Sequence, residues 1–184
     1  MTEVPGHSYT LFETAFGACA LAWNDAGLTC LRLPELSEPL TRAKLLARQP
    51  QAQNSVHQRP AFVEHALAAV QAHLSGQMHD LRDLTLDLSA ASDFESAVYL
   101  ATRALDPGQT CTYGEMAHAL GQPKAMRAVG QALGHNPWPL IVPCHRVVAA
   151  GRRLGGFSAP GGSDTKRRLL LLEAGMRRRV GQLF

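Results

Sequence analysis

The chain has 184 residues, of which 46% are hydrophobic and 18% charged; this balance excludes a disordered chain and allows one large or two small domains. No run approaches the roughly 20 apolar residues of a membrane-spanning helix, and no basic region followed by an apolar core opens the chain, so we expect a cytoplasmic protein. The net charge of +3 is weak evidence for a nucleic-acid partner, and the 4 cysteines form no Cys-x-x-Cys pair, so we expect free thiols.

The first half of the chain predicts a short sheet and a helix. Two apolar runs, 18–23 and 28–33, are separated by a turn sequence and predict a β-hairpin. The polar stretch 49–60 predicts a loop, residues 61–74 have the apolar spacing of a helix, and 85–88 predict a further strand. This half contains no cluster of residues that indicates catalysis.

The second half predicts a helix-turn-helix. Ser92 and its neighbour form an N-cap for a helix over 94–105. Two short helices follow, over 113–120 and 124–133, joined by a tight turn at Gly121. An ordinary αα-hairpin has the same pattern and is at least as common, so the pattern alone is moderate evidence.

These elements predict an α+β fold in two domains. The first is a small α/β domain over residues 1–88, with a short antiparallel sheet and a helix. The second, over 89–184, is mainly helical and contains the helix-turn-helix.

The second helix of the predicted motif has an unusually smooth surface. We expect this exposed surface to be built from small residues, namely Ala125, Ala128, Gly130 and Ala132. Small side chains allow close approach to a DNA groove without base-specific donors, which suits scanning of any sequence, and Arg127 can enter the base stack. The chain from residue 124 onward is also basic, although a solvated basic surface explains this about equally well.

The strongest chemical signal surrounds Cys144. The apolar residues 140–142 predict a buried strand, which Pro143 ends because proline cannot donate a backbone hydrogen bond. His145 and Arg146 follow at once, and basic groups beside a thiol favour the nucleophilic thiolate. The alternative, an inert buried cysteine, is the usual expectation for any single cysteine and becomes the minority interpretation here.

The relation between Cys144 and His145 depends on the backbone. In an extended chain the two side chains point to opposite sides, so either the backbone turns here or a water links them. Glu173 is the most plausible carboxylate to orient His145, although its spacing alone favours a solvated helix glutamate.

The segment 106–175 resembles the O6-alkylguanine-DNA alkyltransferases (methylated-DNA–protein-cysteine methyltransferases). The resemblance rests on the motifs TYGE, RAVG, NPxP, IVPCHRVV, GGFS and KxxLLxxE, in this order, over about 70 of the 184 residues. The first half resembles the variable N-terminal domain of that family more loosely, through FGACALAWNDAGLTCLRL.

The resemblance implies repair of DNA by direct reversal. Cys144 would accept the alkyl group of O6-alkylguanine irreversibly and once per molecule, with O4-alkylthymine as a further candidate substrate. His145 would deprotonate Cys144 through a water, and Glu173 would complete this relay. Tyr113 would donate its phenolic proton toward N3 of the flipped guanine. Asn136 would tie the helix-turn-helix to the active-site strand.

The same resemblance implies how DNA and the lesion are held. Arg127 would fill the gap that the flipped base leaves in the duplex, and the small surface of its helix would contact DNA. The backbone carbonyls of Cys144 and Val147 would accept hydrogen bonds from the guanine amino group, and Ser158 would contact O6. The implied partner is double-stranded DNA carrying the lesion, and we expect a monomer that binds no membrane.

Two other functions remain open. One is a non-catalytic protein of the same fold, either one that binds alkyl lesions or a regulatory protein. Relatives of that kind lack the nucleophile, so the presence of Cys144 argues against it. The other is a cysteine hydrolase, which would need an oxyanion hole that the sequence does not indicate. Alkyl transfer needs no redox cofactor and no metal, and Asn24 and Thr29 stand where some relatives hold structural zinc, so we expect neither.

Overall fold

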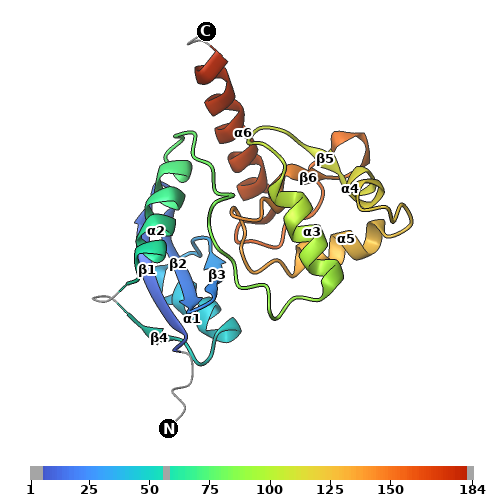
Figure 1. Ribbon diagram of the computed structural model, residues 1–184. Coiled ribbons are helices and arrows are strands. Elements are labelled where there is room, and N and C mark those ends of the chain that lie inside the picture. Colours follow the sequence, from blue (N-terminus) through green and yellow to red (C-terminus); the bar gives the residue numbers. More distant parts are fainter. Residues whose placement is uncertain (1–5, 56–58, 182–184) are drawn as a thin grey trace. The chain divides into compact units, whose positions relative to one another are not determined.

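The computed structural model describes residues 6–55 and 59–181. The chain divides into two compact units, one formed by Met1–Ser75 with His79–Ala90 and the other by Gly76–Met78 with Ala91–Phe184 (Figure 1). Each unit combines helices with a small sheet, which confirms the predicted α+β class. Within the described residues, no helix has the length and apolar character needed to span a bilayer.

The N-terminal unit is built on a four-stranded sheet with the order β3-β2-β1-β4. Its strands are β1 (Ser8–Thr14), β2 (Gly17–Asn24), β3 (Gly27–Arg32) and β4 (Gln53–Asn54). The pairs β1–β2 and β2–β3 are antiparallel, whereas β4 runs parallel to β1. The predicted hairpin is confirmed, and its turn ends at Gly27 with φ +150°, where a Cβ would lie 2.8 Å from the Thr85 carbonyl oxygen.

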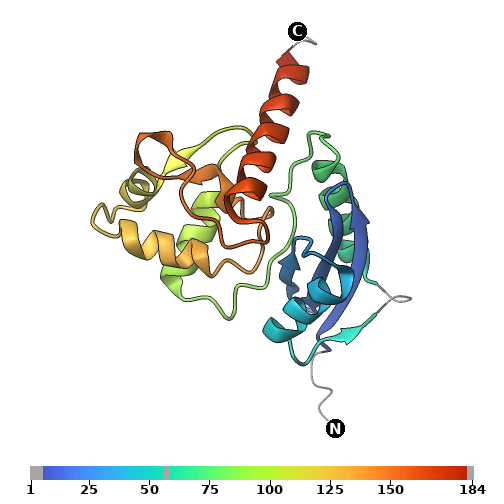
Figure 2. The same cartoon turned by 180° about the vertical axis from the view of Figure 1, so that it is seen from behind.

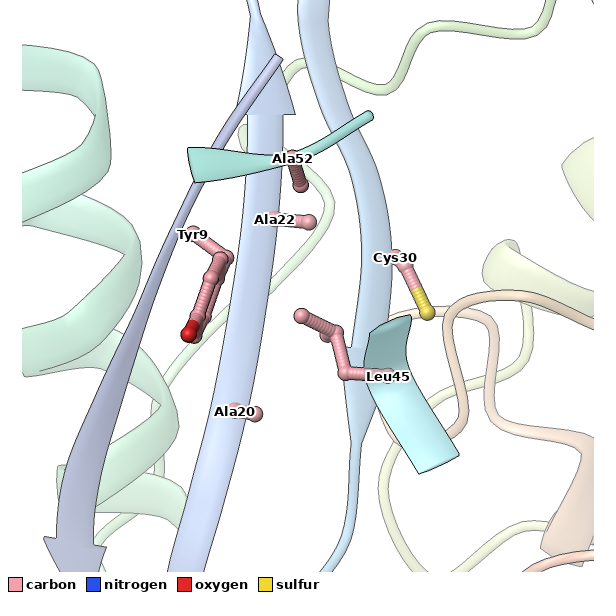
Figure 3. Packing of buried hydrophobic residues seen from close by; sticks show 6 residues of the cluster. All are labelled: Tyr9, Ala20, Ala22, Cys30, Leu45 and Ala52. Carbon is pink, nitrogen blue, oxygen red and sulfur yellow. The ribbon is translucent and has the colours of Figure 1, made fainter. Parts of the chain in front are cut away.

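Two helices cover opposite faces of this sheet (Figures 1 and 2). Helix α1 (Glu38–Arg48) packs on β2 and β3, and α2 (Ala61–Leu74) packs on β1. Because β2 is covered on both faces, side chains of both parities along it are buried. Figure 3 shows one cluster of the core, formed by Tyr9, Ala20, Ala22, Cys30, Leu45 and Ala52.

The expected strand over 85–88 is wrong. Within the described residues, this segment makes only an isolated bridge, between Leu28 and Leu86. The Asp87 carboxylate ends the pairing, because it accepts hydrogen bonds from the Asn24 side chain at 2.7 Å and from the Ser89 backbone N–H at 3.0 Å. The side-chain bonds turn the chain away from the sheet.

The C-terminal unit is mainly helical. Its helices are α3 (Asp93–Arg103), α4 (Tyr113–Ala119), α5 (Met126–Gly134) and α6 (Gly162–Gly181), and its short parallel strands are β5 (Cys111–Thr112) and β6 (Val147–Val148). Helix α5 packs against both α3 and α4. Figure 2 shows α3, α4 and α5 grouped on one side of α6.

The predicted pair of helices joined by a glycine turn is confirmed. A capping box at Thr112 starts α4: the Thr112 hydroxyl accepts from Glu115 N–H at 3.1 Å, and the Glu115 carboxylate accepts from Thr112 N–H. Gly121 ends α4 in the left-handed conformation (φ +69°), which glycine adopts readily. A further turn delays the start of α5 to Met126, two residues later than predicted.

Candidate active site

Cys144 lies at a sharp reversal of the backbone. Pro143 forms an inverse γ-turn (φ −79°, ψ 65°) in which Cys144 N–H donates to the Val142 carbonyl at 2.7 Å. A single turn of 3₁₀ helix, Cys144–Arg146, follows directly. The chain therefore turns at Cys144 and is not extended there.

The predicted strand over 140–142 is wrong. The three residues are buried, but Leu140 has a left-handed backbone (φ +80°), and the only bridge here among the described residues joins Pro139 to Val142. Prolines at 137, 139 and 143 supply no backbone N–H for a ladder, so a strand cannot pair here.

Asn136 holds this irregular segment in place. Its amide nitrogen donates to the Val142 carbonyl at 2.9 Å, and its amide oxygen accepts from Trp138 N–H at 2.9 Å. Both bonds are buried, where an unmade hydrogen bond is costly. Because Asn136 follows α5 by two residues, it joins the end of that helix to the turn that carries Cys144.

A buried ion-pair network lies behind the thiol. The Glu173 carboxylate of α6 contacts His145 Nε2 at 2.8 Å and accepts from Arg146 Nε at 3.0 Å, Arg146 Nη2 at 2.8 Å and Gly108 N–H at 2.9 Å. The solvent exposure of His145 and of Glu173 is 0%. An ionised carboxylate only accepts, so we infer that Nε2 carries the imidazole proton and that Nδ1 carries the lone pair.

Burial and the surrounding polar groups act in opposite directions on the Cys144 thiol. Burial raises the pKa of the Cys144 thiol above its ordinary value; the Asn136 amide, the Lys166 charge and the backbone N–H groups of Cys144 and His145 oppose this rise. That the basic side chains next to Cys144 favour the thiolate stays a prediction. The Arg146 charge is compensated by Glu173, whereas the charge of Lys166, which the sequence analysis did not single out, acts to lower the pKa of Cys144.

A cavity of about 330 Å³ opens onto Cys144. It is lined by Tyr113, Gly130, Leu133, Gly134, Cys144, Gly156, Phe157 and Ser158. Its volume lies at the lower end of the range for small-molecule sites, which fits a single aromatic ring system. The cavity thus brings together three expected site side chains, those of Cys144, Tyr113 and Ser158, and the backbone of Gly130.

Tyr113 is placed beside the cavity by the short sheet. It follows β5 directly, and β5 pairs with β6, which in turn follows the Cys144 turn. Burial and the charge of Cys144 raise the pKa of the Tyr113 phenol, so the group stays protonated and able to donate.

The predicted surface of α5 is partly wrong. Ala125, Ala128 and Gly130 are half-buried, but Ala132 is buried, because it faces α3: its carbonyl accepts from the Tyr99 hydroxyl at 3.1 Å. Arg127 is exposed near the start of the helix, as expected. The helical period explains the error, because residue 132 lies three positions after the buried Val129 and so shares the buried face of the helix with it and with Leu133.

The other cysteines differ from Cys144. All four are free thiols; burial raises the pKa of Cys19 to about 12 and that of Cys30 to about 11. Neither lines the cavity. In residues 6–55 and 59–181, no group of three or more His, Cys, Asp and Glu side chains is placed to hold a metal ion.

Comparisons with known proteins point to one family. Residues 93–175 match the family model described as "6-O-methylguanine DNA methyltransferase, DNA binding domain". The chain is 35% identical over 165 residues to a methylated-DNA–protein-cysteine methyltransferase of Mycolicibacterium paratuberculosis, covering 90% of this chain and 91% of that protein. A protein of the same name from Methanosarcina acetivorans is 32% identical over 165 residues, covering 90% and 97%.

A solved structure agrees with these sequence matches. The crystal structure of Mycobacterium tuberculosis OGT in complex with DNA is similar with a TM-score of 0.74 and 34% identity. The match covers 92% of this chain and 94% of that one.

Proposed function

The chain belongs to the methylated-DNA–protein-cysteine methyltransferase family, and we propose from this that it repairs DNA by moving the alkyl group of O6-alkylguanine onto Sγ of Cys144. The observation that carries the proposal is the position of Cys144. Its thiol borders a cavity large enough to hold one purine base, and a His145–Glu173 pair lies buried behind it. O4-alkylthymine is a further candidate substrate.

The proposed reaction is a single displacement at the alkyl carbon. His145 takes the thiol proton through a bridging water, and Glu173 stabilises the imidazolium that forms. The sulfur–carbon bond forms while the bond from carbon to O6 breaks, and the electron pair of that bond leaves with guanine. Tyr113 donates its proton toward N3 of the leaving base, which its raised pKa permits. The thioether product is stable, so each molecule acts once.

The lesion must leave the duplex to reach the cavity. A base inside the stack is inaccessible, and an alkylated pair is cheaper to open than a normal pair. In the cavity, the carbonyls of Cys144 and Val147 would accept from the guanine amino group, and Ser158 would contact O6. The Cys144 carbonyl accepts from Val147 N–H and the Val147 carbonyl accepts from Lys166 Nζ, and a carbonyl oxygen has two lone pairs. Ala128 and Gly130 leave room for the DNA backbone near α5.

The proposal is tested by the mass of the protein. After incubation with duplex DNA containing O6-methylguanine, the wild-type chain is expected to gain one methyl group, located on the Cys144 peptide. Cys144→Ser is expected to gain none, and Cys19 and Cys30 serve as internal controls because burial raises the pKa of each thiol. An unmodified Cys144 after prolonged contact with the lesion would refute alkyl transfer. Tight binding of the lesion without added mass would support the lesion-binding alternative.

Arg127→Ala is expected to slow transfer from duplex DNA about 10- to 100-fold, if the arginine supplies 1.4–2.8 kcal/mol toward holding the base out of the stack. The measurement is the single-turnover rate on the lesion in a duplex and in a single strand, where no gap needs filling. We expect the single-strand rate to change much less. Arg42→Ala, which removes a half-buried arginine of α1, is the matched control. Equal losses of rate on the duplex and on the single strand would argue against a role of Arg127 in holding the base out of the stack.

A further inference from the structure

Lys166 is a fully buried lysine of α6. Among the described residues, no carboxylate pairs with its charge. It lies on α6 with 0% exposure, and its Nζ donates to the Val147 carbonyl at 2.7 Å and to the Gly156 carbonyl at 3.1 Å. The same nitrogen lies 6.0 Å from the centre of the Tyr113 ring. None of the ion pairs within residues 6–55 and 59–181 includes it.

A buried ammonium group without an anion is costly. Carbonyl oxygens satisfy its hydrogen bonds, but they supply only partial charges against a full one. Burial lowers the pKa of Lys166, and the charge of Cys144 acts in the opposite direction. In return, the charge of Lys166 opposes the rise in the pKa of Cys144.

The other cations near the sulfur are already compensated. Arg146 is bound to Glu173 through two nitrogens, and His145 contacts the same carboxylate. Tyr113 faces the sulfur as a neutral phenol from α4. Among the charged groups of the described site, Lys166 alone has no anion other than the thiolate.

We propose that Lys166 is the counterion of the Cys144 thiolate and a positioning residue for the reaction. Its ammonium group stabilises the sulfur anion while it joins the Val147 carbonyl to the carbonyl of Gly156, a residue that lines the cavity. The inference rests on the proposed function, because Val147 is there assigned to the recognition of guanine. One charge therefore links the reactivity of the sulfur to the shape of the site that receives the base.

The first test measures the thiol without DNA. The rate of Cys144 carbamidomethylation by iodoacetamide is followed against pH by peptide mass spectrometry in wild-type, Lys166→Met and Lys166→Gln proteins. Methionine keeps the length of the side chain without its charge, and glutamine keeps a donor for the carbonyls. Both variants are expected to shift the pH midpoint upward by at least about one unit, which is tenfold less thiolate at a given pH. Lys44→Met, at an exposed position on α1, should leave the midpoint unchanged.

The outcomes separate charge from hydrogen bonding. A wild-type midpoint in folded Lys166→Gln would overturn the counterion role. Because the assay contains no DNA, a wild-type chain that titrates as expected but gains no methyl group from damaged duplex would contradict the proposed function alone.

A second test uses the wild-type protein and so avoids any folding defect. The lysines of the chain are Lys44, Lys124 and Lys166, so the signals of ¹³Cε-labelled lysine are few. Carbamidomethylation of Cys144 removes the anion, so the pKa of Lys166 is expected to fall after this modification, whereas the signals of Lys44 and Lys124 serve as internal references. An unchanged titration of Lys166 would overturn the proposal.

Discussion

Glu173→Ala is expected to lower the free energy of unfolding of the C-terminal unit by about 3–5 kcal/mol. The carboxylate is fully buried and is the only anion that the structure places on the Arg146 guanidinium among the described residues. Without it, Arg146 would remain buried with only the Leu105 carbonyl among its wild-type partners. The Gly108 N–H would also lose its acceptor. An unpaired buried charge costs far more than the deleted pair contributed.

The effect is measured by denaturant unfolding followed through Trp138. Trp23 lies in the other unit, so both the reference and the variant carry Trp23→Phe. Asp164→Ala removes an exposed carboxylate from the first turn of the same helix and is expected to cost less than about 1 kcal/mol. Similar losses of unfolding free energy for Glu173→Ala and Asp164→Ala would mean that Glu173 is not the anion that compensates Arg146.

The sequence predicted well the elements that nearby residues determine. It predicted poorly the elements that depend on contacts distant in the sequence. The hairpin, the helix at 61–74 and the two short helices around Gly121 are encoded by spacing and turn residues within a few positions, and all are confirmed. Strand β1 and helix α1 were not predicted. In β1, buried Tyr9 and Thr10 lie next to each other, so the strand lacks the simple alternation that marks a sheet with one wet face.

Contacts between distant segments also explain what the sequence analysis got wrong or missed near Cys144. Residues 140–142 are apolar and two of them are β-branched, yet the neighbouring prolines and the Asn136 side chain decide their backbone. The buried face of α6 is readable in retrospect, because Lys166, Leu169, Glu173 and Met176 recur at helical spacing. Spacing could have placed Lys166 and Glu173 on one face. It could not have shown that one meets carbonyl groups and the other meets Arg146, because these contacts bridge segments far apart in the chain.

Asn136→Leu is expected to destabilise the C-terminal unit and to slow alkyl transfer more than the stability loss explains. The substitution keeps the approximate volume and leaves the Val142 carbonyl and the Trp138 N–H buried without their amide partner, at about 1–3 kcal/mol each. It also removes the hydrogen bond by which Asn136 lowers the pKa of Cys144, so the pH midpoint of thiol reactivity should rise. Gln122→Leu, an exposed amide in the helix-turn-helix, is the control for stability.

The two effects of Asn136→Leu separate when the rate is measured at a temperature where the variant stays folded. The turn through Leu140 and Pro143 has few other backbone bonds to hold it, and a displacement of the sulfur by about 1 Å costs roughly 100-fold in rate. If Asn136 only stabilised the fold, the folded variant would react at the wild-type rate with an unshifted pH midpoint. A slow rate with a raised midpoint instead means that Asn136, at the end of α5, sets both the position and the acidity of Cys144.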